Sequence, residues 1–233
     1  MIDWHSHVLP GMDDGSRDIN ESLAMLRALG DQGVQTVIAT PHFYANEETV
    51  DSFLGRREER YGLLCGSEDG TFPRVICGAE VRYYPGISRM KDLELLTVKG
   101  TKMLLLEMPM ARWTEYTVKE LTELVSLRRL TVILAHIERY LVFQKKGTFE
   151  SLLESGLMMQ VNASFFDKIG NRRKAFSLLD SGMIHFIASD SHNMTSRPPK
   201  LGRAYELIER RFGEDYVFQM NEFSCRTLKN NSI

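Results

Sequence analysis

The chain has 233 residues, of which 43% are hydrophobic and 26% are charged, and its 29 Lys and Arg against 31 Asp and Glu give a formal net charge of −2. This length fits one sizeable domain or two small ones, and the balanced charge argues against a nucleic-acid-binding surface and against wholesale disorder. The chain has only three cysteines, which predicts a protein without a disulfide framework in a reducing compartment. The N-terminus does not resemble a signal peptide and no apolar run is long enough to span a bilayer, so we expect a cytoplasmic protein.

Short apolar runs alternate with stretches of helical periodicity, which is typical of βα units around a buried parallel sheet. The clearest helix begins after Asp18, where Asp18 and Glu21 have the spacing of a capping box and Gly33 follows the expected end. Strands are predicted at residues 1–5, 34–40, 75–77, 103–106, 131–135, 158–161 and 185–188. Further helices are predicted at residues 50–64, 117–129, 149–155, 172–181 and 201–211.

The number of predicted strands, about seven, is what a closed or slightly irregular α/β barrel needs. An open doubly wound sheet is the alternative, but no Gly-rich phosphate loop or dinucleotide fingerprint follows any strand. No repeat or long linker divides the chain. Residues 1–233 are therefore expected to form one domain.

Candidate metal ligands fall at the predicted strand ends. The first strand ends at His5 and His7, and the later ends carry His42, Glu80, Glu107, His136, Asp190 and His192. Since the C-terminal ends of barrel strands converge on one face, these side chains would ring one mouth. Only His185, at the start of its strand, is expected to be structural.

The pair His5 and His7 is the strongest local signal, because residues i and i+2 of a strand point to the same side. Asp3 is expected on that face, either orienting a ligand or making an ordinary hydrogen bond. Asp190 and His192 repeat the spacing, and a bridging Glu80 would make the site multinuclear.

The segment Asp13-Asp14-Gly15 has two interpretations. It is a typical turn, but two acids just after a His-x-His strand could also supply an oxygen ligand, with Asp14 favoured over Asp13.

Two other hydrolase chemistries are disfavoured. A cysteine-dependent phosphatase needs Cys, five residues and Arg, whereas only four residues separate Cys77 from Arg82, and the cysteines are expected to fill the core. No Gly-x-Ser-x-Gly elbow is present for a serine hydrolase. The chemistry should therefore belong to metal ions.

Six motifs in order resemble the PHP (polymerase and histidinol phosphatase) superfamily, and within it the bacterial manganese-dependent protein-tyrosine phosphatases encoded with capsule and exopolysaccharide genes. The motifs are His5-x-His7, Leu9-Pro10-Gly11 with Asp13-Asp14-Gly15, Ala39-Thr40-Pro41-His42, Gly78-Ala79-Glu80-Val81-Arg82, Ala135-His136-x-Glu138-Arg139 and Ser189-Asp190-x-His192-Asn193. The resemblance covers essentially the whole chain.

The resemblance implies a distorted (β/α)7 TIM-like barrel of the PHP type with up to three divalent ions, manganese by family and iron or zinc by ligand chemistry. Its implied ligand sets are His5, His7, Glu80 and Asp190 for the first ion, Glu80, Glu107 and His136 for the second, and His42, His192 and Asp14 for the third. Arg139 and Arg197 would bind the phosphate as catalytic arginines. The implied substrate is a phosphotyrosine protein, such as the tail of a capsule-assembly tyrosine kinase.

Ile137 and Ser191 depart from the proline and alanine that the family pattern leads us to expect, without removing a ligand. Phe43, Tyr44 and Tyr140 could pack against a substrate ring or belong to the core. Two alternatives stay open: a small-molecule phosphatase of the histidinol-phosphate type, and a non-catalytic, metal-stabilised regulatory protein.

Overall fold

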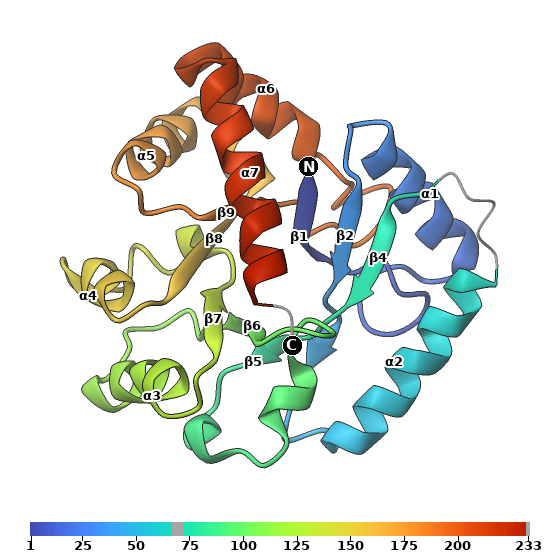
Figure 1. The fold of residues 1–233 in the computed structure, drawn as a ribbon, viewed down its shortest axis with the longest axis horizontal. Helices are drawn as coiled ribbons and strands as arrows, with labels where there is room; N and C mark the ends of the chain where they lie inside the picture. Colours follow the sequence, from blue (N-terminus) through green and yellow to red (C-terminus); the bar gives the residue numbers. More distant parts are fainter. Residues whose placement is uncertain (67–71, 232–233) are drawn as a thin grey trace.

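Strands and helices alternate along the chain as the sequence predicts (Figure 1). The computed structural model describes residues 1–66 and 72–231. Its strands are β1 (Ile2–Ser6), β2 (Thr36–Ala39), β3 (His42–Phe43), β4 (Arg74–Cys77), β5 (Glu80–Arg82), β6 (Met103–Glu107), β7 (Thr131–Leu134), β8 (Met158–Asn162) and β9 (Phe186–Ala188). Its α-helices are α1 (Ile19–Gly30), α2 (Val50–Cys65), α3 (Glu115–Ser126), α4 (Thr148–Glu154), α5 (Ile169–Asp180), α6 (Leu201–Phe212) and α7 (Glu214–Asn230).

Every strand and helix predicted from the sequence is present, with ends shifted by up to three residues. The short strands β3 and β5 and the helix α7 were not predicted. The capping box is only half formed: the Asp18 carboxylate accepts hydrogen bonds from the backbone N–H groups of Asn20 and Glu21, but Glu21 accepts from Arg17 instead of returning to Asp18. The N-cap is therefore correct and its reciprocal bond is not.

The strands close into a distorted barrel of parallel strands. One sheet has the order β1-β2-β4 and the other has the order β3-β5-β6-β7-β8-β9. The chain joins them on one side, where β2 leads into β3 and β4 into β5. On the other side, the Asp190 N–H donates to the His5 carbonyl and the His7 N–H to the Ser191 carbonyl, each at 2.9 Å, so the first strand lies beside the last. This confirms the predicted barrel.

A bulge in β1 sets which side chains enter the barrel. Asp3 pairs with Val37 and Ser6 pairs with Ala39, so β1 has one more residue than β2 between these two pairs. Ile2 and Trp4 join the interior apolar cluster, whereas both carboxylate oxygens of Asp3 accept hydrogen bonds from Ser189. The expectation that Asp3 shares a face with His5 and His7 is therefore wrong, because a plain two-residue alternation does not continue through a bulge.

Two apolar layers hold the barrel together. The interior layer takes residues from most strands, including Ile38, Leu105, Ile133 and Phe186, and the larger outer layer packs the strands against the helices. Helix α7 crosses the end of the barrel where the strands begin (Figure 1): Phe223 and Leu228 pack on the interior cluster, and the Trp4 indole N–H donates to Ser224 Oγ. The opposite end, where the strands finish, stays open for a site.

The cysteines only partly follow expectation. Cys77 is buried in the outer apolar layer, but Cys65 and Cys225 are exposed at helical positions, so only one of the three fills the core. None of them forms a disulfide in the described ranges. No helix among those described has the length and hydropathy to cross a membrane.

Candidate metal centre

The open end of the barrel gathers imidazoles and carboxylates from the predicted strand ends. Four groups have candidate ligand atoms that all lie within 4.8 Å of one another: His7, Asp14, His42 and His192; His5, His7 and Asp190; His5, Glu80 and His136; His42, Glu80 and Glu107. All nine candidate ligands from the sequence belong to this cluster. Because the groups share members, the cluster can hold more than one ion.

His5 and His7 face each other at the centre of the cluster. Their Nε2 atoms are 3.1 Å apart, and the Glu80 Oε2 atom lies 3.1 Å from His5 Nε2 and 3.4 Å from His7 Nε2. The Asp190 Oδ1 atom lies 3.5 and 3.6 Å from the same two nitrogens. All four side chains are buried, so these atoms meet without bulk water.

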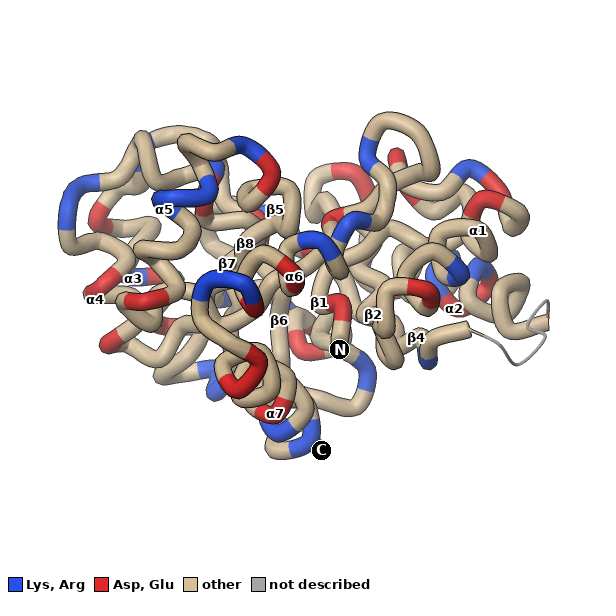
Figure 2. The backbone as a smooth tube through the Cα atoms, turned by 90° about the horizontal axis from the view of Figure 1, so that it is seen from above, with Lys and Arg blue, Asp and Glu red and all other residues tan. Residues whose placement is uncertain are grey.

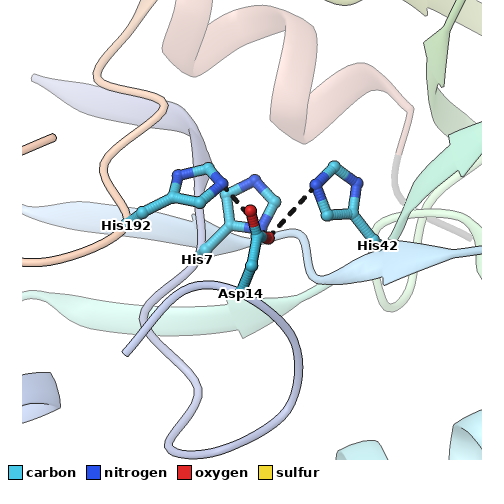
Figure 3. Close-up of side chains that lie close together, drawn as sticks. All are labelled: His7, Asp14, His42 and His192. Atoms are coloured by element: carbon cyan, nitrogen blue, oxygen red, sulfur yellow. Dashed lines mark ion pairs between the residues drawn. The ribbon is translucent and has the colours of Figure 1, made fainter. Parts of the chain in front are cut away.

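Asp13 and Asp14 have different roles in the loop after β1. The Asp13 Oδ2 atom lies 2.7 Å from His7 Nδ1 and accepts the His42 N–H at 2.9 Å, which orients both histidines. The Asp14 side chain is mostly exposed and reaches the outer part of the cluster, with Oδ1 3.4 Å from His42 Nε2 and 3.5 Å from His192 Nε2 (Figure 3). Geometry therefore favours Asp14 over Asp13 as a candidate ligand.

The opposite side of the cluster is built on His136 and the two glutamates. The His136 Nε2 atom lies 2.9 Å from Glu80 Oε1 and 3.8 Å from Glu107 Oε1. The Nδ1 atom lies 3.0 Å from the Tyr140 hydroxyl, which also accepts the Met108 N–H. Tyr140 is fully buried, so it orients His136 and has no surface to offer a substrate ring.

Two cluster residues have strained backbones directly after their strands. His136 has φ 34° and Asp190 has φ 49°, in the left-handed region that side chains other than glycine seldom adopt. His136 is the second residue after β7, and Asp190 is the second residue after β9. Such strain persists where surrounding contacts enforce it, and it is concentrated at functional sites.

Strand β8 supplies a pair of buried amides that the sequence analysis did not single out as site residues. The Gln160 Oε1 atom accepts the His136 N–H at 2.7 Å and lies 3.4 Å from His5 Nδ1. The Gln160 Nε2 atom donates to Asn162 Oδ1 at 2.9 Å, and Asn162 Nδ2 donates to Asp190 Oδ2 at 2.6 Å. This relay links three members of the cluster. The signals in the sequence were the i, i+2 spacing of the two amides and the position of Asn162 at the end of a predicted strand.

Arg139 and Arg197 meet at the same carboxylate oxygen. Their Nη2 atoms donate to Asp190 Oδ2 at 2.6 and 2.8 Å. Their side chains are 34% and 39% exposed, so each guanidinium keeps part of its surface at the mouth. The arrangement places two fixed positive charges beside the cluster, where an anion could be bound.

The donor set fits divalent cations. The Asp190 carbonyl can only accept, so the neighbouring His192 Nδ1 carries the proton and Nε2 has none; that buried Nε2 has no hydrogen-bond partner within the described chain. In the neutral imidazole, His7 likewise donates Nδ1–H to Asp13, and the Nε2 atom that faces His5, Glu80 and Asp190 then has no proton. Acceptor atoms facing one another in a buried site need a cation between them. Mixed imidazole and carboxylate ligands suit manganese, iron or zinc.

The electrostatics of the cluster favour positive charge. Burial lowers the pKa of His5 and His7, but nearby carboxylates outweigh it: Glu80 and Asp190 raise the pKa of His5, and Asp13 raises that of His7 well above its ordinary range. Burial and the charge of His7 lower the pKa of His192 to about 3. Burial also opposes ionisation of Glu80 and Asp190, yet the facing histidines hold their pKa values well below normal.

The remaining residues from the sequence analysis lie as follows. Phe43 is fully buried and Tyr44 is partly exposed, stacked on His42 at 5.3 Å between ring centroids. His185 lies away from the cluster, where its Nδ1 accepts the Met159 N–H. Ser191 is buried and its hydroxyl contacts Ser6 and Ser189, and Ile137 is buried in the outer apolar layer.

Comparison with known proteins covers nearly the whole chain. The family described as "Capsular polysaccharide synthesis, CpsB/CapC" matches residues 1–226. The tyrosine-protein phosphatase YwqE of Bacillus subtilis is 31% identical over 242 residues, spanning 100% of this chain and 93% of that protein. The tyrosine-protein phosphatase CpsB of Streptococcus agalactiae is 29% identical over the full length of both chains. A structure from a study of YwqE and Streptococcus pneumoniae CpsB as metal-dependent tyrosine phosphatases superposes with a TM-score of 0.85, at 27% identity over 100% of this chain and 96% of that one.

Proposed function

This chain belongs to the CpsB/CapC family of capsular polysaccharide synthesis proteins, and from this we propose that it is a metal-dependent phosphatase that hydrolyses phosphotyrosine in proteins. The observation that carries the proposal is the joining of the two parts of a phosphatase site at Asp190. One oxygen of this carboxylate faces His5 and His7, and the other accepts hydrogen bonds from Arg139 and Arg197. A candidate metal centre and an anion-binding pair of arginines therefore share one residue.

In this proposal the ligands are His5, His7, Asp14, His42, Glu80, Glu107, His136, Asp190 and His192, and they hold up to three ions, with manganese as the expected metal. The chemistry that divalent ions supply in such a site is the activation of water near neutral pH and the neutralisation of phosphoryl oxygen charge. Glu80 contacts His5, His42 and His136, so it is the residue best placed to bridge ions.

Arg139 and Arg197 bind the phosphate. Both are held by Asp190 Oδ2, and this bond leaves the other guanidinium N–H groups free to take phosphoryl oxygens. A planar guanidinium matches two oxygens of a phosphate, so two arginines aligned by one carboxylate can fix the phosphorus beside the cluster. Asn162 completes this alignment by donating to the same Asp190 oxygen.

A phosphotyrosine on the tail of a bacterial tyrosine kinase is the substrate that we propose, because the family acts in capsular polysaccharide synthesis. The cytoplasmic location expected from the cysteine content, and residues 1–233 acting as one domain, belong to the same proposal.

The test is hydrolysis of a phosphotyrosine peptide by the manganese-loaded protein. We expect turnover that EDTA abolishes and that manganese restores, and a much lower turnover of histidinol phosphate. The His136→Ala variant should lose activity while its circular dichroism remains that of a folded α/β protein. An intact peptide with wild-type protein, or unchanged turnover in the variant, would contradict the proposal; a preference for histidinol phosphate would support the small-molecule alternative.

A further inference from the structure

A pocket with a mixed apolar and polar lining opens between the loops that follow β6 and β7. Its volume is about 450 Å³, and its lining includes Arg112, Trp113 and Lys145. These loops begin at Glu107 and His136, so the pocket is on the side of the barrel where the cluster lies. We call it the β6–β7 pocket.

The β6–β7 pocket lies close to the cluster. Trp113, which lines it, packs on Tyr140 with ring centroids 5.4 Å apart, and the Tyr140 hydroxyl lies 3.0 Å from His136 Nδ1. Two side chains therefore connect the pocket with a candidate ligand. The Tyr140 and His136 ring centroids are 5.7 Å apart, so the two steps place the Trp113 ring at most about 11 Å from the His136 ring. Two or three residues of an extended peptide span about 7–11 Å, which is enough to reach from a phosphotyrosine at the cluster to this pocket.

The walls of the pocket are fixed by hydrogen bonds between the two loops. The Trp113 N–H donates to Gln144 Oε1 at 3.0 Å, and Gln144 Nε2 donates to the Ala111 carbonyl at 2.8 Å. The Trp113 indole N–H donates to the Pro109 carbonyl, and its ring contacts Phe149. The shape therefore exists before any ligand binds, which lowers the entropic cost of binding.

The charge of the pocket is positive. Arg112 and Lys145 come from different loops, are exposed, and make no ion pair with the described part of the chain, while Glu115 is the one acidic lining residue. Figure 2 shows basic and acidic positions mixed over the helices and loops, so this surplus is local and does not belong to a general basic face. Two unpaired cations on one pocket match an anionic side chain.

We propose that the β6–β7 pocket binds an anionic side chain of the substrate segment, a carboxylate or a second phosphate, a few residues from the phosphotyrosine being hydrolysed. This inference rests on the proposed function for the identity of the substrate. Arg112 and Lys145 supply the charge, and Trp113 supplies the apolar wall against which the side-chain stem packs. The pocket sets which phosphotyrosine segment is preferred and leaves the chemical step unchanged.

The test compares three peptides on the metal-loaded protein, identical except for the residues flanking phosphotyrosine: glutamates, a second phosphotyrosine, or neutral glutamines. We expect the two anionic peptides to have a lower KM than the neutral one. Arg112→Glu and Lys145→Glu should each raise the KM of the anionic peptides by about fivefold. The KM of the neutral peptide, the turnover of p-nitrophenyl phosphate and kcat should stay unchanged.

Arg210→Glu is the matched control. Arg210 is exposed in the last turn of α6, away from the β6–β7 pocket, and its substitution by Glu changes the net charge by the same amount. Equal KM values for anionic and neutral peptides with wild-type protein would overturn the inference. So would an equal effect of Arg210→Glu, which would indicate a general response to net charge.

A binding measurement separates this inference from the proposed function. The same three peptides, with the phosphotyrosine under attack replaced by a non-hydrolysable phosphonate, are bound to the metal-loaded protein, and fluorescence polarisation gives Kd. Weaker binding of the anionic peptides to Arg112→Glu supports the pocket even if no phosphotyrosine were hydrolysed. Equal binding to wild type and variant would reject the pocket even if the phosphatase activity were present.

Discussion

At the scale of single residues, Gln160 determines which nitrogen of His5 faces the cluster. Its Oε1 atom can only accept, and it already accepts the His136 N–H, so a neutral His5 directs Nδ1–H toward it and has no proton on Nε2, the atom that faces the cluster. The amide is itself fixed because Gln160 Nε2 donates to Asn162. A residue outside the ligand set therefore prepares a ligand for its ion.

Gln160→Leu keeps the approximate volume and removes both the acceptor and the donor. We expect the affinity for Mn²⁺ to fall by about 10- to 100-fold, because outer hydrogen-bond partners of metal ligands typically have effects of that size. Isothermal titration of the metal-free protein with Mn²⁺ measures the affinity. Val161→Ala is the control, since Val161 lies on the same strand in the outer apolar layer: it should lower Tm and leave the affinity unchanged. If both variants lost Mn²⁺ affinity equally, the effect of Gln160→Leu would come from destabilised packing of β8 and not from the lost hydrogen bonds to the ligands.

The cysteine thiols are distinguished by burial. Burial raises the pKa of the Cys77 thiol to about 11, so this thiol stays protonated at neutral and mildly alkaline pH, while Cys65 and Cys225 are exposed. N-ethylmaleimide at pH 7 should label Cys65 and Cys225 and leave Cys77 unlabelled until the protein is denatured, because only a thiolate reacts readily. Mass spectrometry of labelled peptides checks this. Full loss of phosphatase activity on labelling would point to thiol chemistry and against the metal proposal.

The nine candidate ligands could be predicted from the sequence because the pattern needed only residue chemistry and strand ends. The preference for Asp14 over Asp13 was also predicted. The contacts of Asp13 with His7 and His42 were not, because they depend on the path of the loop after β1, where Gly11 has φ 60° and the Ser16 N–H returns to the His7 carbonyl. Gln160 could not be recognised either, since an amide inside a strand has no chemical signature of its own. Its role appears only when β8 is placed between β7 and β9.

At the scale of elements, the loop from β1 to α1 depends on a glycine that has no room for a side chain. A Cβ atom on Gly15 would lie 2.4 Å from both the Cβ and the carbonyl oxygen of His7, and 2.9 Å from Asp13 Oδ1. Neither the Cβ atom nor the carbonyl oxygen of His7 can move without a shift of the backbone that follows β1. The glycine therefore lets the loop fold back onto the strand that carries His5 and His7.

Gly15→Ala should destabilise the protein by about 1–3 kcal/mol, the usual cost of forcing extra volume into a filled space, and should weaken Mn²⁺ binding because His7 and Asp13 must move. Gly55→Ala is the control in α2, where an added Cβ meets nothing within 4 Å; it should stabilise by about 0.5–1 kcal/mol. Chemical denaturation gives both values. If the Gly15 variant had wild-type stability and metal affinity, the close approach would not constrain the loop.

The β-bulge in β1 and helix α7 are two features of the elements that the sequence analysis did not predict. Alternation predicted Asp3 on the face of His5 and His7, but an extra residue in β1 reverses the alternation between Asp3 and His5. Helix α7 packs through the partly buried residues Tyr216, Val217, Met220, Phe223 and Leu228, which have helical spacing, while only Ser224 and Thr227 of this helix are fully buried. The spacing was a signal that the sequence analysis missed. The place of α7 is decided by the open end of the barrel, which Phe223 and Leu228 help to close.

At the scale of the whole molecule, the cluster joins the first strand to the last. His5 belongs to β1 and His7 directly follows it, whereas Asp190 and His192 follow β9. Backbone hydrogen bonds join these two segments. The barrel class could be predicted from the number of strands. Which strands would be neighbours, and the division of two of them into β2 with β3 and β4 with β5, depended on packing that no local pattern contains.

Ions bound between the two ends of the chain should stabilise the closed barrel. At a free Mn²⁺ concentration 100 times Kd, binding contributes about 2.7 kcal/mol, which for a chain of this size corresponds to a rise in Tm of about 5–10 °C. Differential scanning fluorimetry with and without EDTA measures it. His192→Ala should show a smaller rise, and a Tm that does not respond to manganese in the wild type would indicate that the cluster does not bind it.

The pairing of β1 with β9 has a consequence for how activity is acquired. Contacts such as His7 with Ser191 join residues near opposite ends of the sequence, and contacts of such long range form late and raise the contact order on which folding rates depend. A nascent chain still attached to the ribosome before β9 has emerged lacks Asp190 and His192, the residues that complete the ligand groups of β1. The ligand groups that include His5 and His7 therefore stay incomplete until the segment after β9 has been made and has paired with β1.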